Sequence, residues 1–212
     1  MQAGFWLIRH AVVAENARAT IYGVMDVELC PATLVSAMPS YAALASHLPQ
    51  PADWVVTPLS RTRLTADAIF RAGYPAAAYT VEPDLIEQSM GEWQGLVHAD
   101  LPAKLRVPAH PFWPMSGTEV PPGGESMATV IGRVGAAMER LAAAATRDTV
   151  IVSHGGAIRA AVAHALGIGP DHALHLSVAN LSLTRMERLD GGWRVIAVNE
   201  TAFLNGPVDR YL

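Results

Sequence analysis

Short apolar runs alternate with helical segments along this chain, and that order limits the folds that it can adopt. Runs of strand length occupy 4–10, 53–58, 78–83 and 148–154, and the last of these, "DTVIVSH", is typical of a strand buried on both faces. Segments typical of helices lie at 31–48, 60–74, 124–146 and 155–168. Strands joined through helices predict an α/β fold, a three-layer sandwich with a mostly parallel central sheet and helices on both faces.

Local signals set the expected ends of two helices. The helix at 31–48 is expected to bend at Pro39, because proline cannot donate a backbone hydrogen bond there. Ser60 is expected to cap the helix at 60–74, and Gly73 to end it.

The remaining segments complete the expected domain. Two runs within 180–199, joined by Asp-Gly-Gly, predict a hairpin that gives the sheet an antiparallel edge. The segment 97–123 is the least regular part and is rich in proline and aromatic residues, which favours a lid or substrate-binding segment. No repeat or linker divides the chain, so 1–212 is expected to form a single domain.

Composition excludes several classes of protein. Hydrophobic residues make up 51% of the chain and charged residues 16%, which is enough apolar material for a core. The net charge is -4 and no basic run occurs, so we expect no nucleic-acid partner. No uncharged apolar stretch reaches the length of a membrane span, and the N-terminus lacks the order of a signal peptide, so we expect no membrane partner. A single cysteine, Cys30, allows no internal disulfide and fits a cytoplasmic location.

Two of the predicted strands end in the same way. The first ends with Arg9 and His10, and the later one ends with His154, which Gly155 and Gly156 follow at the start of a helix. Ligands of open α/β sheets bind at the carboxyl ends of the strands, so both histidines are expected at one edge of the sheet. The two glycines let backbone N–H groups, Gly155 among them, approach an anion at the helix N-terminus.

A third strand is followed by Arg61, in the first turn of the helix at 60–74. A cation is mildly disfavoured there by the helix dipole, so Arg61 is either a solvated surface residue or a ligand for an anion. Guanidinium groups match the oxygens of phosphate, and an imidazole can act as the nucleophile of phosphoryl transfer. Two histidines and two arginines at one sheet edge therefore favour a phosphate site.

A series of short motifs resembles the histidine phosphatase superfamily, the phosphoglycerate-mutase-like group, in its phosphatase branch. The matching stretches are "LIRHAVVAEN", "GVMDVEL", "TPLSRTRLTA", "LIEQSMGEWQGL", "GGES" and "VSHGGAIR". They occur in the order of the family, from about residue 5 to 160, and the ordered set is far more specific than any single motif.

The resemblance implies a role for each residue of the site. His10 would be the nucleophile that becomes phosphorylated, and Glu87 the general acid. The residues implied to bind phosphate are Arg9, Asn16, Arg61 and His154. No metal and no cofactor are expected. Two arginines near His10 would also keep its imidazole neutral, as a nucleophile must be.

Some positions leave alternatives open. Glu82 and Glu92 compete with Glu87 for the role of the acid. Ala11 stands where the family usually has glycine, which puts an extra methyl group beside the nucleophile. His172 and His175 have a spacing that metal ligands use, but no third ligand is suggested, so turn or surface roles are favoured.

The sequence therefore predicts a histidine acid phosphatase-type enzyme, a metal-independent phosphomonoesterase that hydrolyses a small organic phosphate through a phosphohistidine. One candidate substrate class is a nucleoside-like phosphate such as α-ribazole phosphate. The alternatives are a cofactor-dependent phosphoglycerate mutase, or a non-catalytic phosphate-binding protein. Mutases of the family carry a basic insertion after the acid motif, whereas 97–123 supplies only Lys104 and Arg106 as cations. The expected partner is a small phosphate ester, and a homodimer is compatible with the sequence.

Overall fold

The computed structural model describes residues 3–201 of the chain. The strands are β1 (Gly4–Arg9), β2 (Asp53–Val56), β3 (Tyr79–Val81), β4 (Thr149–Ser153), β5 (Leu183–Leu189) and β6 (Gly192–Glu200). The α-helices are α1 (Glu15–Arg18), α2 (Pro31–Ser36), α3 (Met38–His47), α4 (Ser60–Arg71), α5 (Met127–Ala144), α6 (Gly155–Leu166) and α7 (Pro170–Ala173). Short 3-10 helices are η1 (Pro83–Leu85), η2 (Gly91–Trp93) and η3 (His98–Lys104).

The strands form one sheet in the order β3-β2-β4-β1-β5-β6. The pairs β1–β4, β2–β4 and β2–β3 are parallel, whereas β1–β5 and β5–β6 are antiparallel. This confirms the predicted α/β fold with a mostly parallel sheet and an antiparallel hairpin at its edge. The hairpin pairs directly with β1, so the strand that precedes His10 lies inside the sheet, between β4 and β5.

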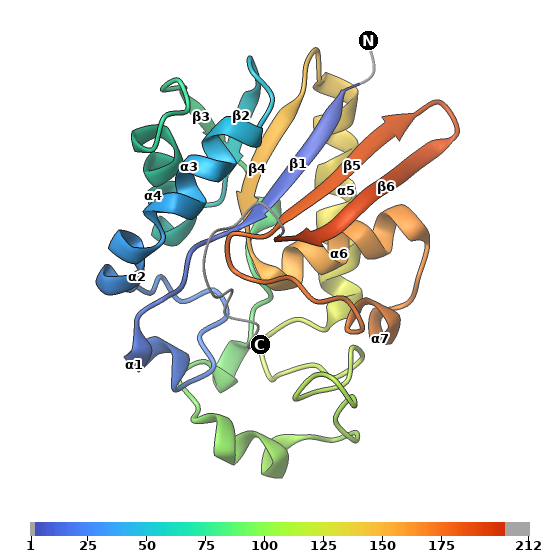
Figure 1. The fold of residues 1–212 in the computed structure, drawn as a ribbon. Helices are drawn as coiled ribbons and strands as arrows, with labels where there is room; N and C mark the ends of the chain where they lie inside the picture. The colour runs from blue at the N-terminus through green and yellow to red at the C-terminus, as the bar shows by residue number, and fades with distance from the viewer. Residues whose placement is uncertain (1–2, 202–212) are drawn as a thin grey trace.

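Helices cover both faces of the sheet, as Figure 1 shows, with α3 and α4 on one face and α5 and α6 on the other. Successive strand residues point to opposite faces. Leu7 of β1 therefore packs in the core beneath α5 and α6, and its neighbour Ile8 packs in the core beneath α3 and α4. In β4, Ile151 joins the first of these cores and Val152 the second. Both strands are thus held from two sides, which gives the residues at their ends a rigid support.

Two helix ends differ from the sequence prediction. The helix expected at 31–48 is broken into α2 and α3 at Ala37, two residues before the expected bend at Pro39. Ser60 does not cap α4: it is the first helical residue, and its backbone N–H and hydroxyl both donate to the carboxylate of Asp26, at 2.8 Å and 2.7 Å. The cap comes from a distant loop, so the sequence around Ser60 does not show it. The helix ends before Gly73, as predicted, where φ is +124°.

The segment 97–123 contains η3 and is otherwise irregular. In Figure 1 it lies below the carboxyl ends of β1 and β4. Leu101 and Met115 from this segment are buried against Ile21 and Trp93, so the segment has a small core of its own. Its position puts it within reach of any ligand bound at the sheet edge.

Two further expectations concern the chain as a whole. The expected domain limits, 1 and 212, lie outside the described residues, so the described part is 3–201 alone. No helix within that part is long and apolar enough to cross a membrane.

Candidate active site

His10 and His154 lie side by side at the carboxyl edge of the sheet. β1 and β4 pair with Arg9 opposite Ser153. The residues that follow the two strands, His10 and His154, therefore lie beside each other. The His10 backbone N–H donates to the Ser153 carbonyl at 2.9 Å, and the two imidazole centroids are 5.2 Å apart. Both histidines are buried. The structure thus brings together the two side chains that the sequence predicts at one edge.

The ring of His10 has a defined tautomer. Nδ1 lies 2.7 Å from the carbonyl oxygen of Ala11, which can only accept, so Nδ1 carries the hydrogen and Nε2 keeps its lone pair. Asn180 donates to the His10 carbonyl at 2.7 Å, and the Ala11 N–H donates to the Thr65 hydroxyl at 3.0 Å. Ala11 itself is buried in the core beneath α3 and α4. The methyl group that departs from the family pattern is therefore accommodated in a packed core.

Arg61 is fully buried, which rules out the solvated surface residue. Its Nη1 and Nη2 donate to the carbonyls of Met25 at 2.7 Å and Gly23 at 2.8 Å. Its Nε donates to Nδ1 of His154 at 3.3 Å. Since Nδ1 of His154 accepts, Nε2 carries the hydrogen and donates to the Thr57 hydroxyl at 2.9 Å. Arg61 is thus fixed by three hydrogen bonds while its charge faces both histidines.

Burial and nearby cations keep both imidazoles neutral. Burial lowers the pKa of His10 well below its ordinary value, and the charges of Arg61 and Arg9 lower it further. Burial likewise lowers the pKa of His154, followed by the effect of Arg61. Burial also lowers the pKa of Arg61, with the charge of Glu87 opposing. A neutral His10 with a free Nε2 has the form that a nucleophile requires.

Glu87 reaches the site from the loop that follows η1. Its Oε2 accepts from the Gly156 N–H at 3.2 Å, and its Oε1 accepts from the Gln88 N–H at 2.9 Å. A β-carbon at Gly156 would lie only 2.2 Å from Glu87 Oε1, so a glycine is needed where the carboxylate approaches α6. This contact places Glu87 beside the helix that His154 precedes.

The two competing carboxylates lie elsewhere. Glu82 accepts from the Asp84 N–H at the start of η1 and pairs with Arg140 at 3.3 Å. Glu92 lies in η2, with its backbone N–H donating to the Pro122 carbonyl, and is exposed. Of the three carboxylates, the contact with α6 singles out Glu87.

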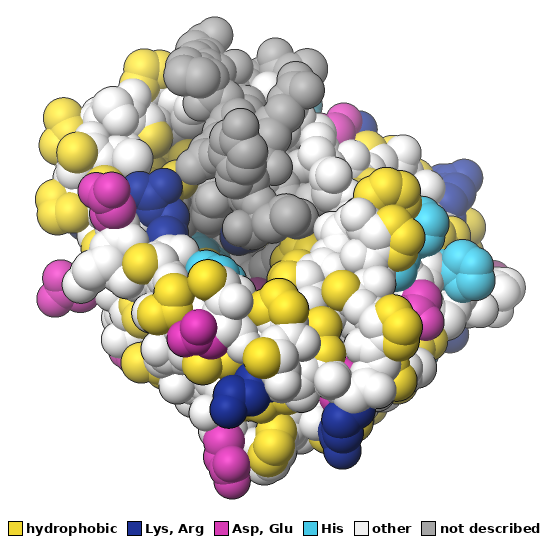
Figure 2. Space-filling view, turned by 90° about the horizontal axis from the view of Figure 1, so that it is seen from below, with side chains coloured by type: hydrophobic (Ala, Val, Ile, Leu, Met, Phe, Trp, Pro, Cys, Tyr) yellow, Lys and Arg dark blue, Asp and Glu magenta, His cyan; other side chains and the backbone are white. Residues whose placement is uncertain are grey.

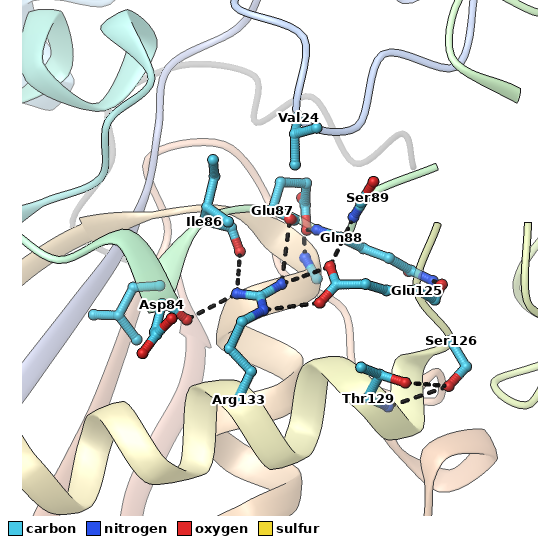
Figure 3. Close-up of polar contacts among 12 residues, drawn as sticks. Val24, Asp84, Ile86, Glu87, Gln88, Ser89, Glu125, Ser126, Thr129 and Arg133 are labelled. Carbon is cyan, nitrogen blue, oxygen red and sulfur yellow. Dashed lines mark hydrogen bonds and ion pairs between the residues drawn. The ribbon is translucent and has the colours of Figure 1, made fainter. Parts of the chain in front are cut away.

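The loop that carries Glu87 is fixed by an arginine that the sequence reasoning missed. As Figure 3 shows, Arg133 of α5 donates to the carbonyls of Asp84 at 2.8 Å and Ile86 at 3.1 Å. The same guanidinium pairs with the Glu125 carboxylate at 2.8 Å, which in turn accepts from the Ser89 N–H at 2.9 Å. Glu125 belongs to the quoted motif "GGES", which was the available signal. The Arg133–Glu125 pair thus forms hydrogen bonds with the loop on both sides of Glu87, which fixes the backbone of the predicted acid.

Arg9 and Asn16 are placed differently. Arg9 donates through Nη1 to the Val178 carbonyl at 2.6 Å, while its buried Nε has no hydrogen-bond partner among the described residues. Asn16 is exposed on α1, and its side-chain oxygen accepts from the Ala17 N–H at 2.9 Å. The structure therefore brings Arg9 into the site and leaves Asn16 at the surface, where its contact with phosphate stays a prediction.

A cavity of about 710 Å³ opens beside these residues. Arg9, Glu87, Gly155 and Gly156 line its polar end. The segment 97–123 forms the opposite wall, with residues from His98 to Met115. Figure 2, which views the molecule from this side, shows hydrophobic side chains and histidines around a hollow. The site combines a cluster of arginines and histidines with a larger, mostly apolar wall.

The other singled-out residues have simpler roles. Trp93, from the motif "LIEQSMGEWQGL", is buried in the small core that it forms with residues of 97–123. His172 and His175 stack at 6.1 Å, and nowhere in residues 3–201 do three or more His, Cys, Asp or Glu side chains form a group that could hold a metal ion. Hydrogen bonds from Thr33 lower the pKa of Cys30.

Comparison with protein families matches residues 5–201 to the histidine phosphatase superfamily (branch 1). The match spans nearly the whole described part, so the chain belongs to this superfamily. This confirms the resemblance that the ordered motifs predicted.

Individual relatives include phosphatases and mutases. A glucosyl-3-phosphoglycerate phosphatase of Mycolicibacterium vanbaalenii is 30% identical over 78% of this chain and 75% of that protein. A bifunctional protein of Mycobacterium tuberculosis is 35% identical over 71% of this chain but only 41% of that protein, so the chain spans less than half of that relative. A solved mycobacterial glucosyl-3-phosphoglycerate phosphatase superposes with a TM-score of 0.79 at 26% identity, covering 94% of this chain and 99% of that one. Other curated relatives are phosphoglycerate mutases.

The lowered pKa of His10 predicts a change of stability with pH. Its folded pKa lies below the ordinary value of 6.5, so between pH 6.5 and 5 the unfolded chain binds more protons. The free energy of unfolding therefore falls as the pH is lowered, and His10 contributes up to about 1.4 kcal/mol per pH unit. His10→Asn should make the fall shallower by that contribution, measured by urea unfolding at several pH values. Equal slopes in the two proteins would mean that His10 keeps its ordinary pKa.

Proposed function

We propose that this protein is a metal-independent phosphomonoesterase that hydrolyses a small organic phosphate through a phosphohistidine on His10. The observation that carries the proposal is the free Nε2 of a neutral, buried His10 beside Arg61, Arg9 and His154. Membership in the histidine phosphatase superfamily supports an enzyme of the phosphatase and mutase type.

In the first step, Nε2 of His10 attacks phosphorus and the bond from phosphorus to the ester oxygen breaks. Arg9 and Arg61 stabilise the charge on the phosphoryl oxygens as it passes between the two groups. His154 donates to the same oxygens after turning its Nε2–H from Thr57. Glu87, entering the step protonated, gives its proton to the leaving alkoxide, which departs as an alcohol.

In the second step, Glu87 acts as the base. It takes a proton from a water molecule, whose oxygen attacks phosphorus and breaks the bond to His10. Inorganic phosphate leaves, Glu87 is again protonated, and His10 is again neutral. The hydrogen bonds that Gly156 and Gln88 donate to the carboxylate position it for both transfers.

Water rather than a second substrate molecule is the proposed acceptor. Lys104 and Arg106 are the cations of 97–123, and neither lines the cavity. Arg106 is instead paired with Glu119 at 3.1 Å. A mutase must keep its phosphorylated product in place for the return transfer, so cations would be expected in the cavity wall that 97–123 forms. The mutases among the relatives keep phosphoglycerate mutase as the second candidate.

We further propose that the chain acts as one domain in the cytoplasm, with 97–123 as its substrate-binding segment. The eight cavity-lining residues between His98 and Met115 support the role of that segment. The single cysteine supports the compartment, because it allows no internal disulfide.

The proposal predicts that the protein hydrolyses p-nitrophenyl phosphate. Addition of about 5 mM EDTA should leave the rate unchanged, because no step uses a metal. His10→Ala should lower kcat by at least about a thousandfold, since it removes the nucleophile. Release of nitrophenolate is the measurement. Equal rates for wild type and His10→Ala would overturn the proposal that the protein is an enzyme. Loss of the rate with EDTA would overturn the metal-free mechanism. Faster isomerisation of 3-phosphoglycerate than hydrolysis would favour the mutase.

The role of Glu87 predicts a dependence on the leaving group. Glu87→Gln should lower kcat by about a hundredfold or more for alkyl phosphates, whose alkoxides need a proton, and by much less for nitrophenyl phosphate. The matched control is Glu92→Gln, which changes an exposed carboxylate of η2 and should leave both rates as in wild type. Rates with a series of esters measure the difference. Equal losses of kcat on all esters would mean that another residue is the general acid.

A further inference from the structure

The cavity is much larger than a phosphate group, and most of the additional space is bordered by apolar side chains. Its volume of about 710 Å³ is in the range of sites that take up a whole organic molecule. The apolar lining comes from two parts of the chain, the loop after α1 and the segment 97–123. Its main members are Ile21, Tyr22, Leu101, Phe112, Trp113 and Met115. The shape of the site therefore provides for the alcohol part of an ester as well as for its phosphate.

The loop 107–118, which forms much of this wall, is fixed at both ends. At its start, the buried carboxylate of Glu119 accepts from the backbone N–H of Arg106 at 2.9 Å, which closes the base of the loop. Near its end, the Gly117 N–H donates to the carboxylate of Asp171 in α7 at 2.7 Å. The wall is thus held in place by the fold itself, and a ligand bound against it has little ordering to impose.

Aromatic contacts hold the rings in the middle of this loop. The ring centre of Phe112 lies 5.6 Å from that of His110 and 5.0 Å from that of His175, which follows α7. The ring centre of Trp113 lies 4.3 Å from the guanidinium carbon of Arg159 on α6. Phe112 lines the cavity and is nevertheless 57% exposed, so much of its ring has no protein neighbour. A ligand that covered this ring would remove apolar surface from water.

Tyr22 extends the apolar lining to the cations of the proposed phosphate position. Its ring centre lies 5.4 Å from the guanidinium carbon of Arg61, and it also lines the cavity. Arg61 in turn donates to His154. The phosphate cluster and the apolar wall are therefore parts of one continuous site.

Polar groups of the lining are mainly used within the protein. The two amide side chains among the described lining residues are those of Gln88 and Asn180. The first donates to the Glu125 carbonyl and the second to the His10 carbonyl, each at 2.7 Å. Nδ1 of His110 accepts from a backbone N–H of its own loop at 3.2 Å. An alcohol rich in hydroxyl groups would lose its water here and gain few partners.

We propose that the substrates are phosphate monoesters of alcohols that carry an apolar ring, and that Phe112 and Trp113 select these esters by packing against the ring. The inference rests on the proposed function, since it places the phosphoryl group of the ester at His10. Burial of the ring supplies the selectivity, and an aromatic ring adds edge or face contacts with the wall. Polyhydroxylated alcohols of the same size are the class that the wall disfavours, because their hydroxyl groups would face apolar side chains.

Two esters of primary alcohols test this preference. Benzyl phosphate carries an apolar ring, and glucose 6-phosphate carries a ring of similar size that bears hydroxyl groups. Wild type should prefer benzyl phosphate in kcat/KM by at least about tenfold, measured by release of inorganic phosphate, because only the apolar ring gains by leaving water. The sugar alcohol is the more acidic of the two, so the chemistry of the leaving group works against this result.

Substitutions of Phe112 test the part of the wall that is assigned to selection. Phe112→Ala should lower the preference about threefold or more, because it removes a ring from the wall, and Phe112→Leu should retain most of the preference, because it keeps an apolar side chain. The matched control is Leu166→Ala, which shortens an equally exposed apolar side chain at the end of α6, outside the cavity lining, and should keep the wild-type preference. A full preference in Phe112→Ala would show that this wall does not select the substrate.

Calorimetry separates this inference from the proposed function. The affinities of both esters are measured on His10→Ala, which cannot turn them over, and benzyl phosphate should again bind more tightly. If wild type hydrolyses glucose 6-phosphate as well as benzyl phosphate, the substrate class is wrong while the phosphatase stands. If His10→Ala binds benzyl phosphate preferentially but wild type hydrolyses neither ester, the apolar wall stands and the phosphatase is wrong.

Discussion

The parallel pairing of β1 with β4 is the constraint on which the site depends. It places Arg9 opposite Ser153, so that His10 and His154 must meet where the strands end. Two packed cores, one on each face of the sheet, fix both strands, and a shift of their register would separate the imidazoles. The site is therefore rigid at its centre, which suits a reaction in which a phosphoryl group moves between positioned donors.

Electrostatics then gives that rigid centre its chemical character. Arg9, Arg61 and Arg159 are bonded mainly to backbone carbonyls, which hold the guanidinium groups without neutralising them. Burial and this positive charge together lower the pKa of His10, and the buried Nε of Arg9 has no hydrogen-bond partner among the described residues. Among the described residues that line the cavity, Glu87 alone carries a carboxylate. A phosphate group bound beside His10 would therefore meet mostly positive charge.

Much of this arrangement could be predicted because it follows from local order in the sequence. The alternation of strands and helices predicted the sheet. Because His10 and His154 each directly follow a strand, their place at one edge of the sheet could also be predicted. Contacts between distant segments could not be predicted. The burial of Arg61 depends on carbonyls of a preceding loop, the cap at Ser60 comes from Asp26, and the partnership of Arg159 with Trp113 joins a helix to an irregular segment. No periodicity or short motif encodes such pairs, because they arise only when the fold closes.

The central claim is that Nε2 of His10 accepts the phosphoryl group, and the most direct measurement is to trap that intermediate. The protein is mixed with an excess of a rapidly cleaved ester and quenched in alkali, where phosphohistidine survives. Mass spectrometry then locates the phosphate, and phosphorus NMR distinguishes the two ring nitrogens. This mechanism predicts phosphate on Nε2 of His10, because the Nδ1–H of the same ring donates to the Ala11 carbonyl. Phosphate on Nδ1 or on another residue, or turnover without any phosphorylated enzyme, would contradict it.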